Sequence, residues 1–419
     1  MSPRREIILL ALLFGLLYFI QGVAEPTEGL IAQPVRSQLR FLNLRTGEIS
    51  AISAMISLPW SLKPLFGLLT DYVPLLGYRR KSYLLGATLA TTVGLLVLLA
   101  IPFDLTNLRS ILGWIFVATL GVAFADVVVD ALSVHTGQKY GITGRLQAIQ
   151  WGAMYTATIL TGTIGGYLSQ RRLPHVGFLI CAVLAGASCL MALLLVHEVR
   201  VHPPHSSAKP RGEFRAALSN LWATLRSPLT LTVGAFLFLW AFNPFSSSVQ
   251  ESYMTYELHQ SPQFIGHMKS LFAVGAISSC LVYGLVGQRL SLTWLVHGSI
   301  GLGVLSSLAY WGMHGQASTI VVSLVAGFCY MLGTLVQLDV AARACDENSA
   351  GTTFALLMAL SNLGASLSGW VGGHWYDWLA MTLGNHHAAY HVLVGSGAIC
   401  TAACWFLVPV MRRSGLFAR

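Results

Sequence analysis

The sequence contains few charged residues. Only 10% of its 419 residues are Asp, Glu, Lys or Arg, and 55% are hydrophobic. A typical soluble domain has about 25% charged residues. Since so few charges cannot cover the surface of a water-soluble fold of this length, we expect an all-α protein that crosses the membrane many times.

Signals of catalysis and of metal binding are also missing. The seven cysteines lie within or at the end of apolar runs, and Cys400 and Cys404 have no His or carboxylate at metal-ligand spacing. We interpret the cysteines as buried thiols and expect no disulfide framework, no metal site and no cofactor. No nucleophile beside a base and no phosphate-binding loop stands out. The chain is therefore not expected to be an enzyme.

The formal net charge of +9 does not indicate nucleic-acid binding. The basic residues lie in short segments between apolar runs, and no basic stripe interleaved with aromatic residues is present. Basic residues in such segments set the orientation of a membrane protein. We therefore expect the lipid bilayer as a partner and no nucleic acid.

Apolar runs long enough to cross a bilayer as helices recur twelve times. They centre near residues 7–31, 49–70, 83–102, 111–135, 146–168, 175–197, 229–250, 264–287, 292–312, 318–343, 352–376 and 389–410. Twelve spans place both termini on one side. With this assignment seventeen of the 25 basic residues lie on the side of the termini, seven lie on the other side and Lys63 lies inside a span. The bias predicts a multi-pass protein of the inner or plasma membrane with both termini cytoplasmic.

The spans fall into two sets of six. The longest polar connection runs from Val199 to Ser227, which predicts a bundle at 1–198, a cytoplasmic linker at 199–228 and a second bundle at 229–419. Residues 144–168 align with 351–375, with matching glycines at an offset of 207. Duplicated six-span halves are typical of secondary transporters, whose sites lie near the midplane between the halves.

Two charged pairs lie four residues apart inside spans. Asp126 and Asp130 share one helix face, and two such carboxylates in a low dielectric cannot both ionise easily. They are candidates for proton coupling. The alternative is that one of them pairs with a base and has a structural role. Asp339 and Arg343 form the second pair; Arg343 would bind an anionic substrate, or the two would neutralise each other.

Lys63 is the charge inside the second span, and it has three possible roles. It would meet the substrate, extend toward the membrane surface, or pair with an acid of the fourth span; we favour the pairing. Pro26 should disturb the first span beside Glu25. Polar candidates in other spans, each alone more often a helix–helix contact than a ligand contact, are Gln21, Glu25, Gln150, Trp151, Asn243 and Asn362.

Several segments together resemble a known family. They include YFIQG (18–22), LPWSLKPLFGLLTD and LGYRRKSYL (within 58–84), ADVVVDAL (125–132), GRLQAIQWG (144–152) and AARAC with GTTFALLMALSNLGASLSG (341–369). The chain resembles a folate–biopterin transporter, a branch of the major facilitator superfamily, from about Tyr18 to Pro409. The resemblance implies twelve transmembrane helices in two pseudo-symmetric six-helix bundles, alternating access and proton-coupled import of a folate or pterin. It also implies a conformational latch formed by Gly67, Asp71, Arg79, Arg80 and Lys81.

The substrate class fits the polar residues of the spans. A flat pterin ring would stack on Trp60 or Trp151, and folate carboxylates would be attracted by Lys63 or Arg343. The chain departs from the family pattern at His135 and Asp346, and the acid at Asp339 is not part of that pattern either. These departures concern the charged interior, so they bear on the solute more than on the fold. Alternatives are a permease for another organic anion or an amphipathic solute, and a non-transporting membrane sensor on the same fold.

Overall fold

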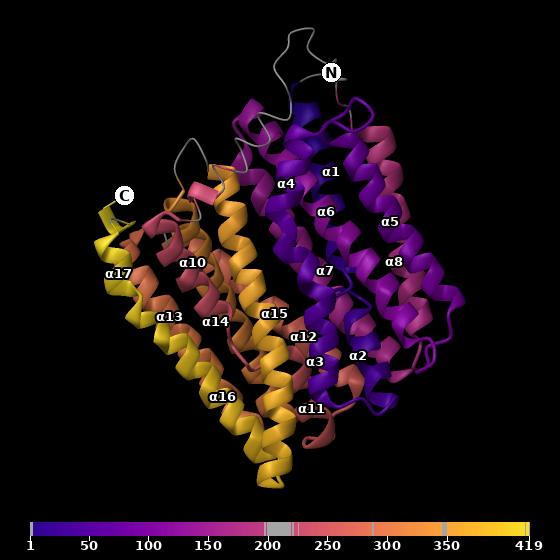
Figure 1. Cartoon of the computed structure of the whole chain (residues 1–419), viewed down its shortest axis with the longest axis vertical. Helices are drawn as coiled ribbons and strands as arrows, with labels where there is room; N and C mark the ends of the chain where they lie inside the picture. Colours follow the sequence, from indigo (N-terminus) through magenta and orange to yellow (C-terminus); the bar gives the residue numbers. More distant parts are fainter. Residues whose placement is uncertain are drawn as a thin grey trace.

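The chain folds into a bundle of long helices in a computed structural model, which describes residues 3–196, 198, 219, 222–224, 226–286, 289–345, 350–414 and 416–418. Most of the predicted linker 199–228 and the departure at Asp346 lie outside these residues. Figure 1 shows both termini at one end of the bundle, which we call the terminal end. The opposite end, where α2 and α11 lie, is called the far end.

Helices α1–α8 lie together on one side of the molecule and form what we call the N-half (Figure 1). Their bounds are α1 Pro3–Ala24, α2 Ala32–Phe41, α3 Thr46–Ser57, the 3-10 turn η1 Leu58–Leu62, α4 Lys63–Tyr72, α5 Lys81–Ala100, α6 Leu108–Tyr140, α7 Thr143–Gln170 and α8 Pro174–Leu195.

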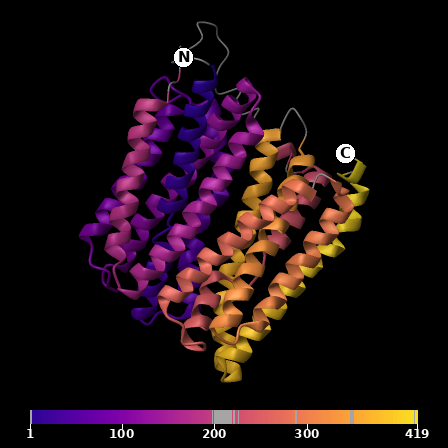
Figure 2. The same ribbon diagram turned by 180° about the vertical axis from the view of Figure 1, so that it is seen from behind.

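Helices α10–α17 form the other side, which we call the C-half and which Figure 2 shows from behind. Their bounds are α10 Pro228–Ala241, α11 Ser247–Tyr256, α12 Pro262–Val286, α13 Leu292–Ala309, η3 Tyr310–Gly312, α14 Gln316–Arg343, α15 Ala350–Leu383, α16 His386–Ala403, η4 Cys404–Phe406, α17 Val408–Arg413 and η5 Leu416–Ala418.

Ten helical segments of the described chain are long and apolar enough to cross a membrane. The predicted spans at 146–168 and 229–250 are not among them. Helix α7 is long enough but is rich in Thr, Gly and Gln, and it packs against α12 of the other half. Helix α10 stops after 14 residues and the chain continues as α11. The all-helical membrane fold is confirmed, and the count of twelve spans stays a prediction.

Several spans of the described chain are interrupted at or beside a proline. Helix α1 ends at Ala24, directly before Glu25 and Pro26, as the proline predicts. The α10–α11 break contains Pro244, and Pro59 is the second residue of the 3-10 turn between α3 and α4. Interrupted helices leave backbone groups free inside a membrane protein, where they line cavities or bind polar groups.

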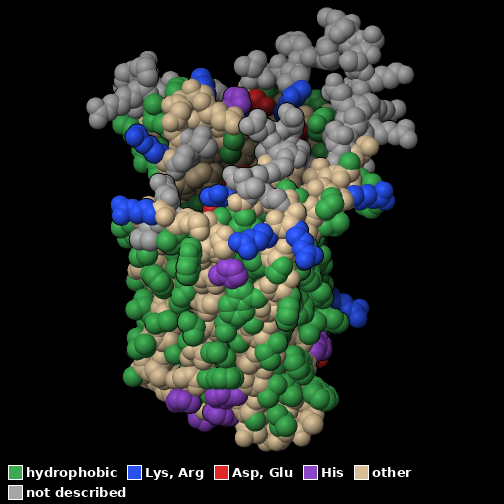
Figure 3. Space-filling view, turned by 90° about the vertical axis from the view of Figure 1, so that its left-hand side faces the viewer, with side chains coloured by type: hydrophobic (Ala, Val, Ile, Leu, Met, Phe, Trp, Pro, Cys, Tyr) green, Lys and Arg blue, Asp and Glu red, His purple; other side chains and the backbone are tan. Residues whose placement is uncertain are grey.

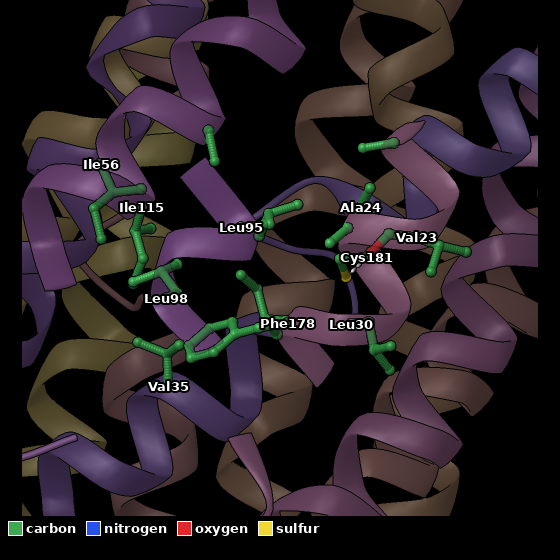
Figure 4. Packing of buried hydrophobic residues seen from close by; sticks show 14 of the residues in the cluster. Val23, Ala24, Leu30, Val35, Ile56, Leu95, Leu98, Ile115, Phe178 and Cys181 are labelled. Carbon is green, nitrogen blue, oxygen red and sulfur yellow. Dashed lines mark hydrogen bonds between the residues drawn. The ribbon is translucent and has the colours of Figure 1, made fainter. Parts of the chain in front are cut away.

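A buried apolar cluster holds the N-half together around the α1–α2 break (Figure 4). Leu95 and Leu98 of α5 and Phe178 of α8 lie at its centre and are almost completely buried. The thiol of Cys181 donates a hydrogen bond to the carbonyl of Val23, 3.5 Å away. This bond satisfies a carbonyl near the end of α1, so the cysteine serves the packing of the break.

The surface agrees with insertion into a bilayer. In Figure 3 hydrophobic side chains cover most of the visible flank, and the visible basic side chains gather toward the terminal end. Trp294, Leu285 and Phe406 are among many large apolar residues that remain exposed. A surface this apolar is stable in contact with lipid.

Repeated glycines occupy corresponding positions in the two halves. Gly165 packs against the carbonyl of Leu30 at the α1–α2 break, and Gly372 packs against the carbonyl of Pro244 at the α10–α11 break. The next glycine in each case, Gly166 or Gly373, faces the opposite half. Each glycine pair therefore joins a broken helix of its own half to the surface between the halves.

Candidate functional site

Lys63 forms a buried ion pair with an acid of the fourth predicted span. It is the first residue of α4, and its Nζ lies 2.5 Å from Oδ2 of Asp126. The Lys63 side chain is 21% exposed and that of Asp126 only 6%. The same Nζ lies over the Trp60 ring, 4.7 Å from the ring centroid. The structure thus pairs Lys63 with an acid, as favoured from the sequence.

Helix α1 supplies a neutral partner to each acid of α6. Gln21 Nε2 donates a hydrogen bond to Asp126 Oδ1 at 2.6 Å, and the Tyr18 hydroxyl donates to Asp130 Oδ1. Tyr18 and Gln21 are one turn apart on α1, as Asp126 and Asp130 are on α6, so the two pairs form successive rungs between the helices. We call Tyr18, Gln21, Lys63, Asp126 and Asp130 the charged cluster.

Tyr18 was not among the residues expected from the sequence. It belongs to the YFIQG segment, three residues before Gln21. This i, i+3 spacing places both side chains on one face of α1, and it is the signal that would have identified Tyr18. Its ring is buried against apolar residues of α6 and α7, so only the hydroxyl is left for polar contact.

Glu25 lies beside the charged cluster but has a structural set of partners. Its carboxylate accepts hydrogen bonds from the backbone N–H groups of Thr27 and Glu28, at 2.8 and 2.5 Å, and from the Thr27 hydroxyl. Trp60 Nε1 donates to the same carboxylate at 3.4 Å. Glu25 therefore satisfies backbone donors freed by the break after α1.

Asn362 connects the C-half to this region. Its Nδ2 donates a hydrogen bond to the backbone carbonyl of Trp60 at 3.1 Å. Trp60 thus contacts Lys63 through its ring, Glu25 through its Nε1 and α15 through its carbonyl. Movement of α15 would therefore be transmitted to the 3-10 turn Leu58–Leu62, which directly precedes Lys63.

Four other predicted residues lie apart from the charged cluster. Asn243 accepts from the backbone N–H of Phe245 at 3.0 Å and donates to Ser307 at 3.2 Å, so it stabilises the α10–α11 break. Asp339 and Arg343 pair within α14 at 3.2 Å, the self-neutralising arrangement, and both are partly exposed. Trp151 is exposed and stacks on Tyr155.

Gln150 is buried, yet neither polar atom of its side chain has a hydrogen-bond partner among the described residues. It lies on α7 one turn from Leu146 and from Met154, which pack in the same apolar cluster as Tyr18. A buried amide without partners is costly and marks a place where a ligand or water would bind. Gln150 therefore stays a candidate for contact with solute.

The predicted latch residues contact three helices of the N-half. Arg80 Nη2 lies 3.8 Å from Asp71, its Nη1 donates to the carbonyl of Ala131, and Lys81 Nζ donates to the carbonyl of Leu193 at 2.9 Å. Glu198, which was not expected from the sequence, accepts the backbone N–H groups of Arg79, Arg80 and Lys81. A carboxylate at the start of α5 is favourable because helix N-termini carry partial positive charge.

A Cβ at Gly67 would meet Val127 of α6 at 3.9 Å, an ordinary van der Waals distance, so the packing there does not require a glycine. Among the described residues, no group of three or more His, Cys, Asp or Glu side chains is arranged to hold a metal ion. The chemistry that the charged cluster offers is therefore that of two carboxylates, one ammonium and the neutral hydrogen-bonding groups of Tyr18 and Gln21.

Comparisons with known proteins identify the family of the chain. Residues 37–412 match the BT1 family. The folate–biopterin transporter of Synechocystis sp. is 28% identical over 387 residues, which cover 87% of this chain and 74% of that protein. A probable folate–biopterin transporter of Arabidopsis thaliana is 24% identical, with 88% and 89% covered.

Solved structures show the same fold at low sequence identity. A nucleoside transporter superposes with a TM-score of 0.71 at 14% identity, covering 95% of this chain and 98% of that one. A D-xylose–proton symporter gives a TM-score of 0.69 at 14% identity, with 98% and 99% covered. The chain therefore belongs to the BT1 family, and it is a multi-pass membrane transporter with the major facilitator fold.

Proposed function

We propose that this transporter imports folate or pterin-type solutes by alternating access, driven by protons, with both termini in the cytoplasm. The observation that carries the proposal is the charged cluster, which places two acids and one lysine inside the membrane-spanning part of the N-half. Buried intramembrane charges are costly and are kept in transporters for ion and substrate pathways. The names of relatives from a cyanobacterium and a plant support the solute class.

The charge balance of the cluster favours a proton as coupling ion. With both acids ionised and Lys63 charged, Asp126, Asp130 and Lys63 carry one net negative charge. One bound proton makes the cluster neutral. A neutral cluster has a lower desolvation cost when the halves move and enclose it in a low-dielectric environment. A proton on Asp126 also releases Lys63, whose ammonium can then attract a carboxylate of the solute.

The far end of the interface between the halves is closed. Thr46 of α3 donates to Ser252 of α11 at 3.0 Å, and the backbone N–H of Gly47 donates to Asp377 of α15 at 2.7 Å. Gln33 Nε2 reaches the carbonyl of Pro262 at 2.6 Å. Import from the far end requires these contacts to break and re-form in each cycle, as alternating access demands.

Transport itself is tested in proteoliposomes that hold the purified protein. We expect labelled folate or biopterin to accumulate when the exterior is more acidic than the lumen, and to leak out after addition of a protonophore. Liposomes without protein provide the baseline. Accumulation that is insensitive to the pH gradient would refute proton coupling, and no uptake of either compound at any pH would refute the solute class.

The roles of the two acids separate in a second experiment. We expect Asp130→Asn to lower gradient-driven accumulation by about ten-fold, because Lys63 pairs with Asp126 and leaves the Asp130 carboxylate as the group that takes up the proton. Counterflow exchange without a gradient should remain in this variant. The matched control is Tyr18→Phe, which removes the hydroxyl donor to Asp130 but keeps the carboxylate. Full gradient-driven uptake in both Asp130→Asn and Asp126→Asn would exclude the cluster from coupling.

A further inference from the structure

Two arginines share one glutamate across the far end of the interface. Arg36 Nε and Nη2 lie 2.9 and 2.6 Å from Glu251 Oε1, and Arg40 Nη2 lies 2.8 Å from Glu251 Oε2. Their side chains are 6%, 8% and 9% exposed. The buried Nη1 of Arg40 has no hydrogen-bond partner among the described residues. This arginine–glutamate cluster therefore contains one more positive than negative charge and one unused donor.

The two charge types belong to different halves. Arg36 and Arg40 lie four residues apart on α2, which packs on α3, α7 and α8 of the N-half. Arg36 Nη1 also donates to the carbonyl of Thr27 at 3.3 Å, which fixes it to the α1–α2 break. Glu251 lies on α11, which packs on α12, α15 and α16 of the C-half and meets α3 of the N-half across the interface. When the halves separate at the far end, the arginines stay with one half and their carboxylate leaves with the other.

Nearby carboxylates are already engaged. Glu28 pairs with Lys269 of α12 at 3.2 Å, and Glu25 accepts the backbone donors of Thr27 and Glu28. Glu28 is the acid that would compete for the arginines once Lys269 has moved away with the C-half. Its side chain is 60% exposed, however, so it already interacts with solvent. Opening of the far end thus leaves two adjacent guanidinium groups without their buried counter-ion.

We propose that Arg36 and Arg40 are a carboxylate-binding site for the incoming solute, which takes the place of Glu251 when the far end opens. Guanidinium groups bind carboxylates through charge-assisted hydrogen bonds. Glu251 shows how the two arginines share one carboxylate: Oε1 accepts from Nε and Nη2 of Arg36, and Oε2 accepts from Nη2 of Arg40. Closure of the far end returns Glu251 to the arginines and displaces the solute toward the interior. The site deepens the proposed function, on which it rests, by selecting solutes that carry a carboxylate.

The test compares folate, which carries carboxylates, with biopterin, which has none, in proteoliposomes. We expect Arg40→Gln to raise the KM for folate by about ten-fold, the effect of losing one charge-assisted hydrogen bond, and to leave the KM for biopterin within about two-fold. Arg40→Lys keeps the charge but loses the planar guanidinium, so its KM for folate should lie between those of the wild type and Arg40→Gln. The matched control is Arg45→Gln at the same end, because Arg45 is exposed.

A second variant distinguishes a binding site from a simple gate. Glu251→Gln removes the internal competitor, so we expect it to lower the KM for folate, opposite in sign to Arg40→Gln. If the cluster served only to hold the far end closed, both variants would shift folate and biopterin in the same direction. Equal shifts for both compounds, or no shift in Arg40→Gln, would overturn the proposal.

Failure of the proposed function gives a different pattern. If the wild-type protein transported neither folate nor biopterin, the solute class would be wrong while the arginine site could still be tested. Thermal unfolding of Glu251→Gln is then measured with glutarate and with uncharged glutaramide. We expect glutarate alone to raise the Tm, and to lose this effect in the Arg40→Gln/Glu251→Gln double variant. Absence of a glutarate effect would overturn the site itself.

Discussion

Replacing Lys63 by methionine is expected to abolish gradient-driven uptake and to lower the free energy of unfolding by about 3 kcal/mol. Methionine replaces the unbranched stem up to Cε but removes the ammonium that lies 2.5 Å from Asp126. Within the part of the chain that the structure describes, the Asp126 carboxylate then keeps the Gln21 amide as its one side-chain hydrogen-bond donor, at 2.6 Å. Removal of one partner from a buried ion pair costs about 3–5 kcal/mol. We expect the lower end of this range because Lys63 retains some solvent access.

The double variant Lys63→Met/Asp126→Leu separates stability from function. It removes both charges, so most of the lost stability should return while uptake stays absent. The control is Lys139→Met, which makes the same change at an exposed position of α6. Unfolding is followed by urea titration in detergent and uptake in proteoliposomes. Normal uptake in Lys63→Met, or additive effects of the two substitutions on stability, would show that the pair is unimportant.

Substitution of Gly266 by alanine is expected to open the far end and to lower uptake by about ten-fold. Helix α12 meets α7 there at backbone distance: an added Cβ at Gly266 would lie 2.6 Å from Cα of Gly166, and one at Gly166 would lie 2.9 Å from Cα of Gly266. Such contacts are too short for a methyl group, so the two helices must separate. Since α7 and α12 belong to different halves, the cost falls on the closed state and not on the folding of either half.

Gly284→Ala on the same helix is the matched control, because a Cβ at Gly284 meets no atom within 4 Å. Opening is measured as thiol labelling of Ser252→Cys, a buried position at the far end, above the background of the native cysteines. We expect labelling to be faster with Gly266→Ala and unchanged with Gly284→Ala. Equal labelling in the two backgrounds would mean that the α7–α12 contact does not control closure of the far end.

Features within one helix could be predicted from the sequence. Spacing alone predicts the pairing of Asp339 with Arg343, the shared face of Asp126 and Asp130, and the end of α1 before Pro26. These follow from helix geometry and from the missing N–H of proline. Lys63 could be assigned to the acids of α6 because few other charges lie at membrane depth.

Contacts between helices could not be predicted in the same way. Arg36 and Arg40 read as bases of an external loop, yet they are buried against Glu251, more than 200 positions away. Two further contacts were also missed: the Glu198 carboxylate with the backbone N–H groups at the start of α5, and the Tyr18 hydroxyl with Asp130. Which helix faces which depends on packing between segments distant in sequence, and a single sequence contains no direct record of that packing.

The contact of Gly266 with Gly162 and Gly166 has a consequence for the entropy of the transport cycle. The atoms nearest to an added Cβ at Gly266 are backbone atoms of Gly162 and Gly166, so this closest approach itself freezes no rotamers when the halves meet. Leaving the contact likewise gains little side-chain freedom. The halves can therefore part and return to the same register many times, with little change in conformational entropy at the point where they touch.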